Sequence, residues 1–131
     1  MALISVFSIQ TAGAQTTTTP RTAFLDGMQS SVVTSIGAQD NTVEIVLTGP
    51  VLTVLRVNSN QNASSHVGRN SEATSIAGVA SKALIADSAS AGVHTIRVQY
   101  ISRDSAHPEG NVIDTVEFRK NSKGAFDIHI S

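Results

Sequence analysis

Apolar residues recur at helical spacing in two parts of the chain. In the first part, apolar positions four residues apart predict a helix over residues 22–36. That stripe consists of Phe24, Met28, Val32 and Ile36. In the second part, one face of small and branched side chains predicts a helix over residues 71–88. That face consists of Ala73, Ile76, Ala77, Ala80 and Leu84. Gly78 costs on the order of 1 kcal/mol inside a helix, and we expect it to let the helix approach a sheet closely.

Alternation of apolar and polar residues predicts five strands, two between the helices and three after the second helix. The first two, residues 41–48 and 51–57, are separated by Gly49-Pro50. We expect a hairpin turn there, because Pro lacks the N–H that a strand ladder needs. The last three strands are predicted at residues 93–101, 111–120 and 125–131.

The predicted elements follow one another in the order α-β-β-α-β-β-β. Consecutive hairpins make the sheet mostly antiparallel, and the two helices would pack on one face of it. The sequence therefore predicts an α+β fold, a two-layer sandwich. The 131 residues suit a single domain over residues 22–131, preceded by a signal-peptide-like segment at 1–14 and a linker at 15–21.

The N-terminal segment has features of an export signal. Residues 2–9 are apolar, and Ala12-Gly13-Ala14 has the small-x-small form of a signal-peptidase site, with cleavage expected after Ala14. No Lys or Arg precedes the apolar segment, and a disordered apolar tail is the alternative. The sequence QTTTTPR that follows is expected to be an extended linker ending where Pro20 opens a helix. These features predict a periplasmic or secreted protein.

Composition narrows the classes of function. The chain contains no Cys, which excludes disulfides, thiol nucleophiles and thiolate metal sites. The formal net charge is −1 and no basic tract interleaved with aromatic residues is present, so we expect no nucleic-acid partner. No apolar stretch approaches the roughly 20 residues of a membrane-spanning helix. The four histidines lack metal-ligand spacing, and we expect no metal ion and no cofactor.

The polar stretch RVNSNQNASSHVGRN, residues 56–70, is the leading candidate for a binding site. It leads into the predicted N-terminus of the second helix, where unpaired N–H groups and the helix dipole favour an anion. His66 and Arg69 would be the foremost contacts. The alternative is a solvated connection in which Asn70 or Ser71 caps the helix. The predicted binding residues are Arg56, Asn58, Asn60, His66, Arg69 and Asn70.

Two titratable side chains, those of Asp114 and His129, are candidates for a catalytic acid or base. Asp114 is predicted to share a strand face with Val112, Val116 and Phe118, so its carboxylate needs a partner or a raised pKa. It is either a poised acid in a pocket or the partner of an arginine or a backbone N–H. His129 would lie on the polar side of the last strand, with Glu117 and Arg119 as cross-strand neighbours. No nucleophile motif is present, and we assign no catalytic residue.

Two pieces of the sequence resemble the BON domain of small periplasmic and outer-membrane-associated bacterial proteins. They are TVEIVLTGPVLTV, with Gly49 at the hairpin, and EATSIAGVASKAL in the following helix. The resemblance covers about residues 31–101 and implies the order helix, β-hairpin, helix, strand. It also implies a periplasmic location and association with phospholipid or the envelope. The last two predicted strands have no counterpart in that family, and no functional residues are carried over.

Together these features predict an exported, non-catalytic binding or accessory module of a bacterial envelope. Its expected partner is an envelope protein or a small anionic ligand, with peripheral membrane association as a further possibility. One alternative is a small hydrolase or isomerase that uses Asp114 or His129 in a pocket between helix and sheet. Another is a structural subunit that adds a strand to a neighbour.

Overall fold

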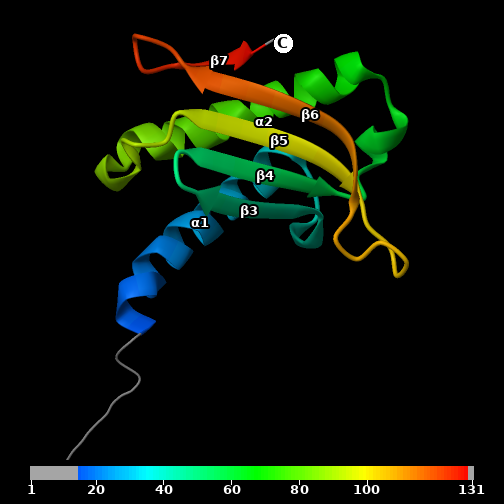
Figure 1. Cartoon of the computed structure of the whole chain (residues 1–131), viewed down its shortest axis with the longest axis horizontal. Coiled ribbons are helices and arrows are strands. Elements are labelled where there is room, and N and C mark those ends of the chain that lie inside the picture. The colour runs from blue at the N-terminus through cyan, green and yellow to red at the C-terminus, as the bar shows by residue number, and fades with distance from the viewer. Residues whose placement is uncertain (1–14, 130–131) are drawn as a thin grey trace, which may run out of the picture.

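The computed structural model describes residues 15–129, which form two long helices and a five-stranded sheet (Figure 1). The long helices are α1 (Gln15–Ile36) and α2 (His66–Ala86). The strands are β3 (Val43–Thr48), β4 (Val51–Val57), β5 (Thr95–Ser102), β6 (Asn111–Lys120) and β7 (Phe126–His129). Short 3-10 helices in the connections are η1 (Asp40–Thr42), η2 (Asn60–Ala63) and η3 (Ser88–Ser90).

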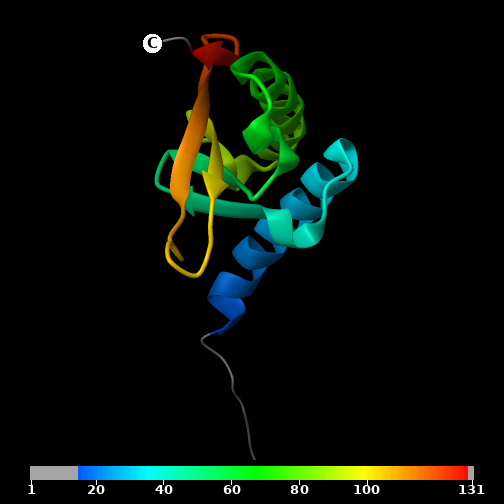
Figure 2. The ribbon, with the colours of Figure 1, turned by 90° about the vertical axis from the view of Figure 1, so that its right-hand side faces the viewer.

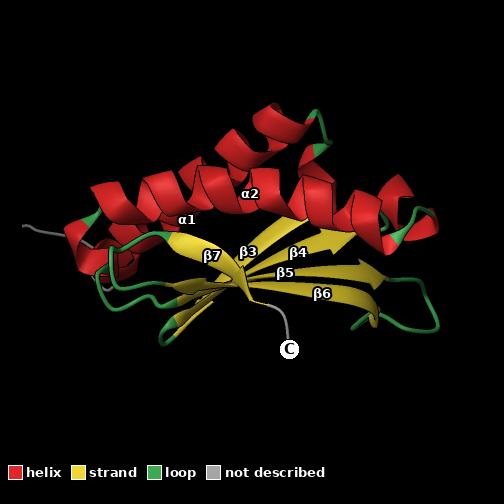
Figure 3. Ribbon diagram, turned by 90° about the horizontal axis from the view of Figure 1, so that it is seen from above, coloured by secondary structure: helices red, strands yellow, loops and turns green. Residues whose placement is uncertain are grey.

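The strands lie in the sheet in the same order as in the chain, β3-β4-β5-β6-β7. The pair β4 and β5 is parallel because α2 connects them as a crossover, and the other three pairs are antiparallel. Both long helices lie on one side of the sheet, and no helix in the described range covers the other side (Figures 2 and 3). The predicted two-layer α+β sandwich and its element order are confirmed.

Helix α1 begins at Gln15, so the prediction of an extended linker over residues 15–21 is wrong. Its packed part carries the predicted stripe, with Met28 2 % and Val32 0 % exposed. A helix anchored in this way gains one hydrogen bond for each residue added to it. Thr costs at most about 0.7 kcal/mol per residue relative to Ala, so the Thr-rich segment continues the helix. The first turns of α1 project past the edge of the sheet at β3 (Figures 1 and 2).

Two glycines with positive φ set the boundaries around the first helix and hairpin. Gly37 ends α1 with a φ of 66°, and the N–H of Ala38 then donates to the carbonyl of Val33 at 3.0 Å. Gly49 has a φ of 57° and forms the two-residue turn with Pro50, which confirms the predicted hairpin between β3 and β4.

The core lies between α2 and the packed face of the sheet. The predicted apolar face of α2 is buried throughout, and Ile96 and Val98 at the centre of the sheet are 0 % exposed. The predicted close contact between Gly78 and the sheet is wrong. Gly78 is exposed, and a Cβ added there would have no atom within 4 Å. Helix α2 reaches the sheet through its alanines, which lie on the other side of the helix from Gly78.

A register shift in β6 breaks the predicted alternation of that strand. The pairing of β5 with β6 slips between Tyr100 and Ile101, which leaves one extra residue on β6. Asp114 keeps the packed side with Val116, but Val112 is 58 % exposed and does not share a buried face with them. The signal-peptide-like segment and the last two residues of the predicted strand 125–131 lie outside the described residues.

Candidate functional site

A row of polar side chains crosses the packed face of the sheet beneath the start of α2. Arg56 on β4 is in register with Tyr100 on β5, which is in register with Asp114 on β6. The first two turns of α2 place three more polar side chains above this row. We call the six residues the helix-side network: Arg56, His66, Arg69, Glu72, Tyr100 and Asp114.

The centre of the network is a buried ion pair between Arg56 and Glu72. Arg56 is 4 % exposed and donates to both carboxylate oxygens, from Nε at 3.0 Å and from Nη2 at 3.2 Å. Its remaining N–H groups donate to Ser59 Oγ at 2.8 Å and to Thr42 Oγ1 at 3.0 Å. The Tyr100 hydroxyl donates to Glu72 Oε1 at 2.9 Å. Burial is the largest cause that raises the pKa of Tyr100, and this hydrogen bond is the second. Both charges are therefore fully hydrogen-bonded within the fold.

Asp114 is held in its ionised form at the edge of the network. Arg69 Nε donates to its Oδ2 at 2.9 Å, His66 Nδ1 lies 2.6 Å from the same oxygen, and the N–H of Thr115 donates to Oδ1 at 2.8 Å. Burial, the largest single influence, raises the pKa of Asp114, but these hydrogen bonds outweigh it and hold the pKa below its ordinary value. Of the two sequence interpretations, the geometry matches the partner of an arginine and not the poised acid.

Helix α2 starts at His66, five residues before the predicted start at Ser71. The cap is Ser65, whose side chain accepts the N–H of Gly68 at 3.2 Å, and neither Asn70 nor Ser71 caps the helix. The physical reason is tertiary: the contacts of Arg69 with Asp114 and with the carbonyl of Ser64 fix the first turn.

Four of the six predicted binding residues have side-chain partners within the fold, and in three of them, Arg56, Asn58 and Arg69, these contacts take up much of the hydrogen-bonding capacity. Arg56 and Arg69 belong to the helix-side network, and Arg69 Nη1 also donates to the carbonyl of Ser64 at 2.6 Å. Asn58, with a φ of 53°, makes two hydrogen bonds to the β5–β6 connection. Its Nδ2 donates to the carbonyl of Arg103 at 2.9 Å, and its Oδ1 accepts the N–H of Arg103 at 2.7 Å. These contacts leave the three side chains little capacity for a ligand.

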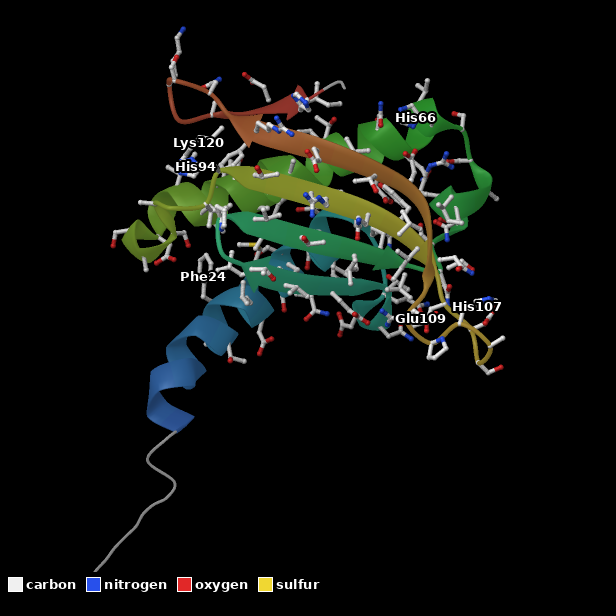
Figure 4. The ribbon with its side chains drawn as sticks, in the orientation of Figure 1. Phe24, His66, His94, His107, Glu109 and Lys120 are labelled. Atoms are coloured by element: carbon white, nitrogen blue, oxygen red, sulfur yellow. The ribbon has the colours of Figure 1, made fainter. Side chains whose placement is uncertain are left out.

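The other three predicted binding residues lie at separate places. Asn60 is exposed in η2, and Asn70 lies within α2 with a buried Oδ1 that has no hydrogen-bond partner in the described part of the chain. His66 lies at the first turn of α2, near β6 (Figure 4); it belongs to the helix-side network through Asp114, but its side chain is 61 % exposed. A binding role for Asn60, His66 and Asn70 stays a prediction.

The contact between His66 and Asp114 resembles the carboxylate–imidazole pairing that orients a catalytic base. The His66 side chain is 61 % exposed, and its Nδ1 faces the carboxylate. None of the three cavities described below is lined by either residue. His129, the other predicted acid or base, lies on the opposite side of the sheet, so it cannot act in a pocket between helix and sheet.

The uncovered side of the sheet carries a charged half. Arg97, Glu117 and His129 lie side by side on β5, β6 and β7, which confirms the predicted neighbours of His129. Arg97 Nε donates to Glu117 at 2.9 Å and Arg119 Nη2 donates to it at 3.2 Å. Arg97 first, and then Arg119, hold the pKa of Glu117 below its ordinary value. A cavity of about 220 Å³ opens here, lined by Thr115, Glu117, Arg119 and His129.

On β3 and β4 the same side of the sheet carries aliphatic residues beside Glu44, which pairs with Arg103. Val46 is 46 % exposed, and Val51 and Leu55 are half-buried. No motif in the sequence marks these residues, although the alternation of β3 places Val46 on the opposite side from the buried Val43. We call the side that no described helix covers the open face, and its residues are Glu44, Val46, Thr48, Val51, Thr53, Leu55, Thr95, Arg97, Gln99, Thr115, Glu117, Arg119, Asp127 and His129.

Two other cavities lie along α2. One of about 320 Å³ separates α2 from β7 and is lined by Gly78, Phe126 and Ile128 among others. The other, of about 290 Å³, lies at the C-terminal end of α2 beside Lys120 and Lys123. The described residues bring together no group of three His, Asp or Glu side chains that could hold a metal ion.

Within residues 15–129, no helix has both the length and the apolar character needed to span a bilayer. Comparisons of the chain with protein-family models, with curated proteins and with solved structures found no match, so its function has to be inferred from its residues and their geometry.

Proposed function

We propose that the chain is a non-catalytic binding module of a bacterial envelope and that its open face receives a partner protein. The observation that carries the proposal is the difference between the two sides of the sheet. On the packed side, the buried charges are hydrogen-bonded to one another. On the open face, aliphatic residues and arginine N–H donors lie on neighbouring strands, and no helix of residues 15–129 covers them.

The shape of the open face favours a macromolecule over a small ligand. Small-molecule sites are concave and enclose most of the ligand. The cavity on the open face holds about 220 Å³ and is lined by polar side chains at one end of a broad sheet surface. Arginine is among the residue types enriched at protein interfaces, and the exposed aliphatic side chains of this surface would be buried by such a partner.

Charge on the open face argues against a membrane as the occupant. Peripheral binding to anionic lipid uses clusters of several Lys or Arg side chains. Here Arg97 and Arg119 share the face with Glu117 and Asp127, so positive and negative side chains are balanced. The partner is therefore expected to be a protein with both apolar and charged contacts.

The location of the protein is part of the proposal, supported by the apolar residues 2–9 and the small-x-small site that ends at Ala14. In its native cells, the full-length chain is expected to be cleaved after Ala14 and recovered from the periplasm or medium. Mass spectrometry of the mature chain checks this. An N-terminus at Gln15 agrees with export, whereas protein that is recovered from the cytoplasm and still carries residues 1–14 contradicts it.

Replacing Val46 by Lys is expected to remove the protein from its native complex. A buried charge at an interface costs several kcal/mol, so the amount of complex should fall by about tenfold or more. The side chain is 46 % exposed, and surface substitutions usually change stability by about 0.5 kcal/mol or less. The measurement is the sedimentation of the protein in detergent-free extracts of native envelopes.

The matched control is Val67→Lys, at an exposed valine of α2 on the helix side. It introduces the same charge on the opposite side of the molecule and should leave the complex intact. If both variants sediment like the unmodified protein, the open face is not the binding surface. If Val67→Lys alone releases the protein, the binding surface is on the helix side.

A further inference from the structure

Two arginines on the open face are held by one carboxylate. Arg97 donates to Glu117 Oε2 from Nε at 2.9 Å, and Arg119 donates to Glu117 Oε1 from Nη2 at 3.2 Å. A guanidinium has five N–H groups. In the part of the chain that the structure describes, these are the hydrogen bonds that the two arginine side chains make, so most of their donors remain available. Glu117 therefore orients both guanidinium groups and occupies only part of their N–H donors.

The available donors border a cavity with further polar groups. Thr115, Glu117, Arg119 and His129 line its volume of about 220 Å³. Arg97 is in register with Glu117 on the neighbouring strand, which places its side chain beside the cavity. The hydroxyl of Thr115 and the imidazole of His129 add hydrogen-bonding capacity next to Arg119.

The charged side chains around the cavity balance one another. The two arginines contribute two positive charges, and Glu117 is ionised because both arginines donate to it. Asp127, in register with Arg119, supplies a second negative charge; like Arg97 it does not line the cavity, and it accepts a hydrogen bond from Asn121 at 2.7 Å. The attraction for a carboxylate therefore comes from the available guanidinium N–H donors and not from a net positive charge.

These ion pairs contribute little to stability, because the side chains of Arg97 and Arg119 are 35 % and 56 % exposed. What the arrangement provides is a pair of oriented guanidinium groups, which bind planar oxyanions through two parallel hydrogen bonds.

We propose that this cavity binds one carboxylate of the partner protein, from an Asp or Glu side chain, through Arg97 and Arg119. Thr115 and His129 add hydrogen-bonding groups to the site. The inference rests on the proposed function, because it names the chemical group by which the open face recognises its partner. Inorganic phosphate is the alternative oxyanion that such a site could bind, and it is tested in parallel.

The test is an NMR titration of the full-length ¹⁵N-labelled chain with sodium acetate, at a constant ionic strength of about 0.15 M. Saturable shifts are expected for the amides of Thr115 and Glu117 and for the ring of His129. Arg119→Gln should weaken acetate binding by about tenfold or more, because it removes charge-assisted hydrogen bonds. The control Arg103→Gln changes an arginine that pairs with Glu44 at 2.7 Å, away from the cavity, and should leave binding unchanged.

Three outcomes would overturn the inference. They are shifts that do not saturate, equal acetate affinity in Arg119→Gln and the unmodified chain, or saturable binding of inorganic phosphate without binding of acetate. Failure here is distinguishable from failure of the proposed function. If the Val46→Lys variant still loses the complex while acetate does not bind, the open face receives a partner by other contacts.

Discussion

Replacing Glu72 by Ala is expected to lower the free energy of unfolding by about 3–5 kcal/mol. The substitution leaves the guanidinium of Arg56, which is 4 % exposed, without its carboxylate partner. It also removes the acceptor of the Tyr100 hydroxyl at 2.9 Å. Breaking one side of a buried pair is costly because the other charge stays buried. Urea unfolding followed by circular dichroism measures the effect.

Two variants separate the buried pair from ordinary surface electrostatics. Glu44→Ala breaks the pair with Arg103, whose side chains are 44 % and 30 % exposed, and should cost far less than Glu72→Ala because exposed ion pairs contribute little. Combining Arg56→Leu with Glu72→Leu removes both charges and should recover most of the loss, since apolar replacements of buried pairs are often neutral. Equal costs for Glu72→Ala and Glu44→Ala would show that the Arg56–Glu72 pair is not buried as described.

Asp114→Asn is expected to lower the free energy of unfolding by roughly 1–3 kcal/mol at neutral pH, with a characteristic dependence on pH. The carboxylate accepts from Arg69 at 2.9 Å and from the N–H of Thr115 at 2.8 Å, and an amide weakens the contact with the cation. The folded-state pKa of Asp114 is depressed, so the contribution is fully present above the unfolded pKa of about 3.9. It is lost as the pH falls through the lower folded-state pKa.

The measurement is the difference in unfolding free energy between the unmodified chain and Asp114→Asn at a series of pH values. The difference isolates Asp114 from the other carboxylates, provided that they titrate alike in both chains. The part that comes from the ionisation of Asp114 should still be present at about pH 5 and should shrink below about pH 4. A difference that grows as the pH falls would mean that the pKa of Asp114 is raised in the fold.

The elements could be predicted from the sequence because their signals are local. The stripe ending at Ile36, the Gly49-Pro50 turn and the alternation in β5 each depend on residues close together in the chain. The start of α2 was missed because it is fixed by contacts of Arg69 with Asp114, 45 residues away. The crossover that makes β4 and β5 parallel likewise follows from packing of α2 and not from either strand alone.

The helix-side network left a signal in the sequence that can be recognised in retrospect. Arg56 continues the alternation of Leu52 and Val54, so it occupies an inward position of β4. Glu72 precedes Ile76 by four residues and occupies the apolar face of α2. Two opposite charges on two buried faces predict a buried pair. The sequence could not show that the same residues would thereby be withdrawn from a binding role, because that depends on which segments meet in space.

The central claim, that the open face and not the helix side meets a partner, is tested most directly by cysteine labelling. The natural sequence has no Cys, so Thr53→Cys on the open face and Ser75→Cys on exposed α2 each provide a single thiol. The maleimide labelling rate of each variant is measured in native envelopes and in the purified chain. With the partner at about ten times its Kd, labelling at position 53 should be about tenfold slower in envelopes, with position 75 unchanged. Equal rates at position 53 in both preparations, or protection at position 75 alone, would contradict the claim.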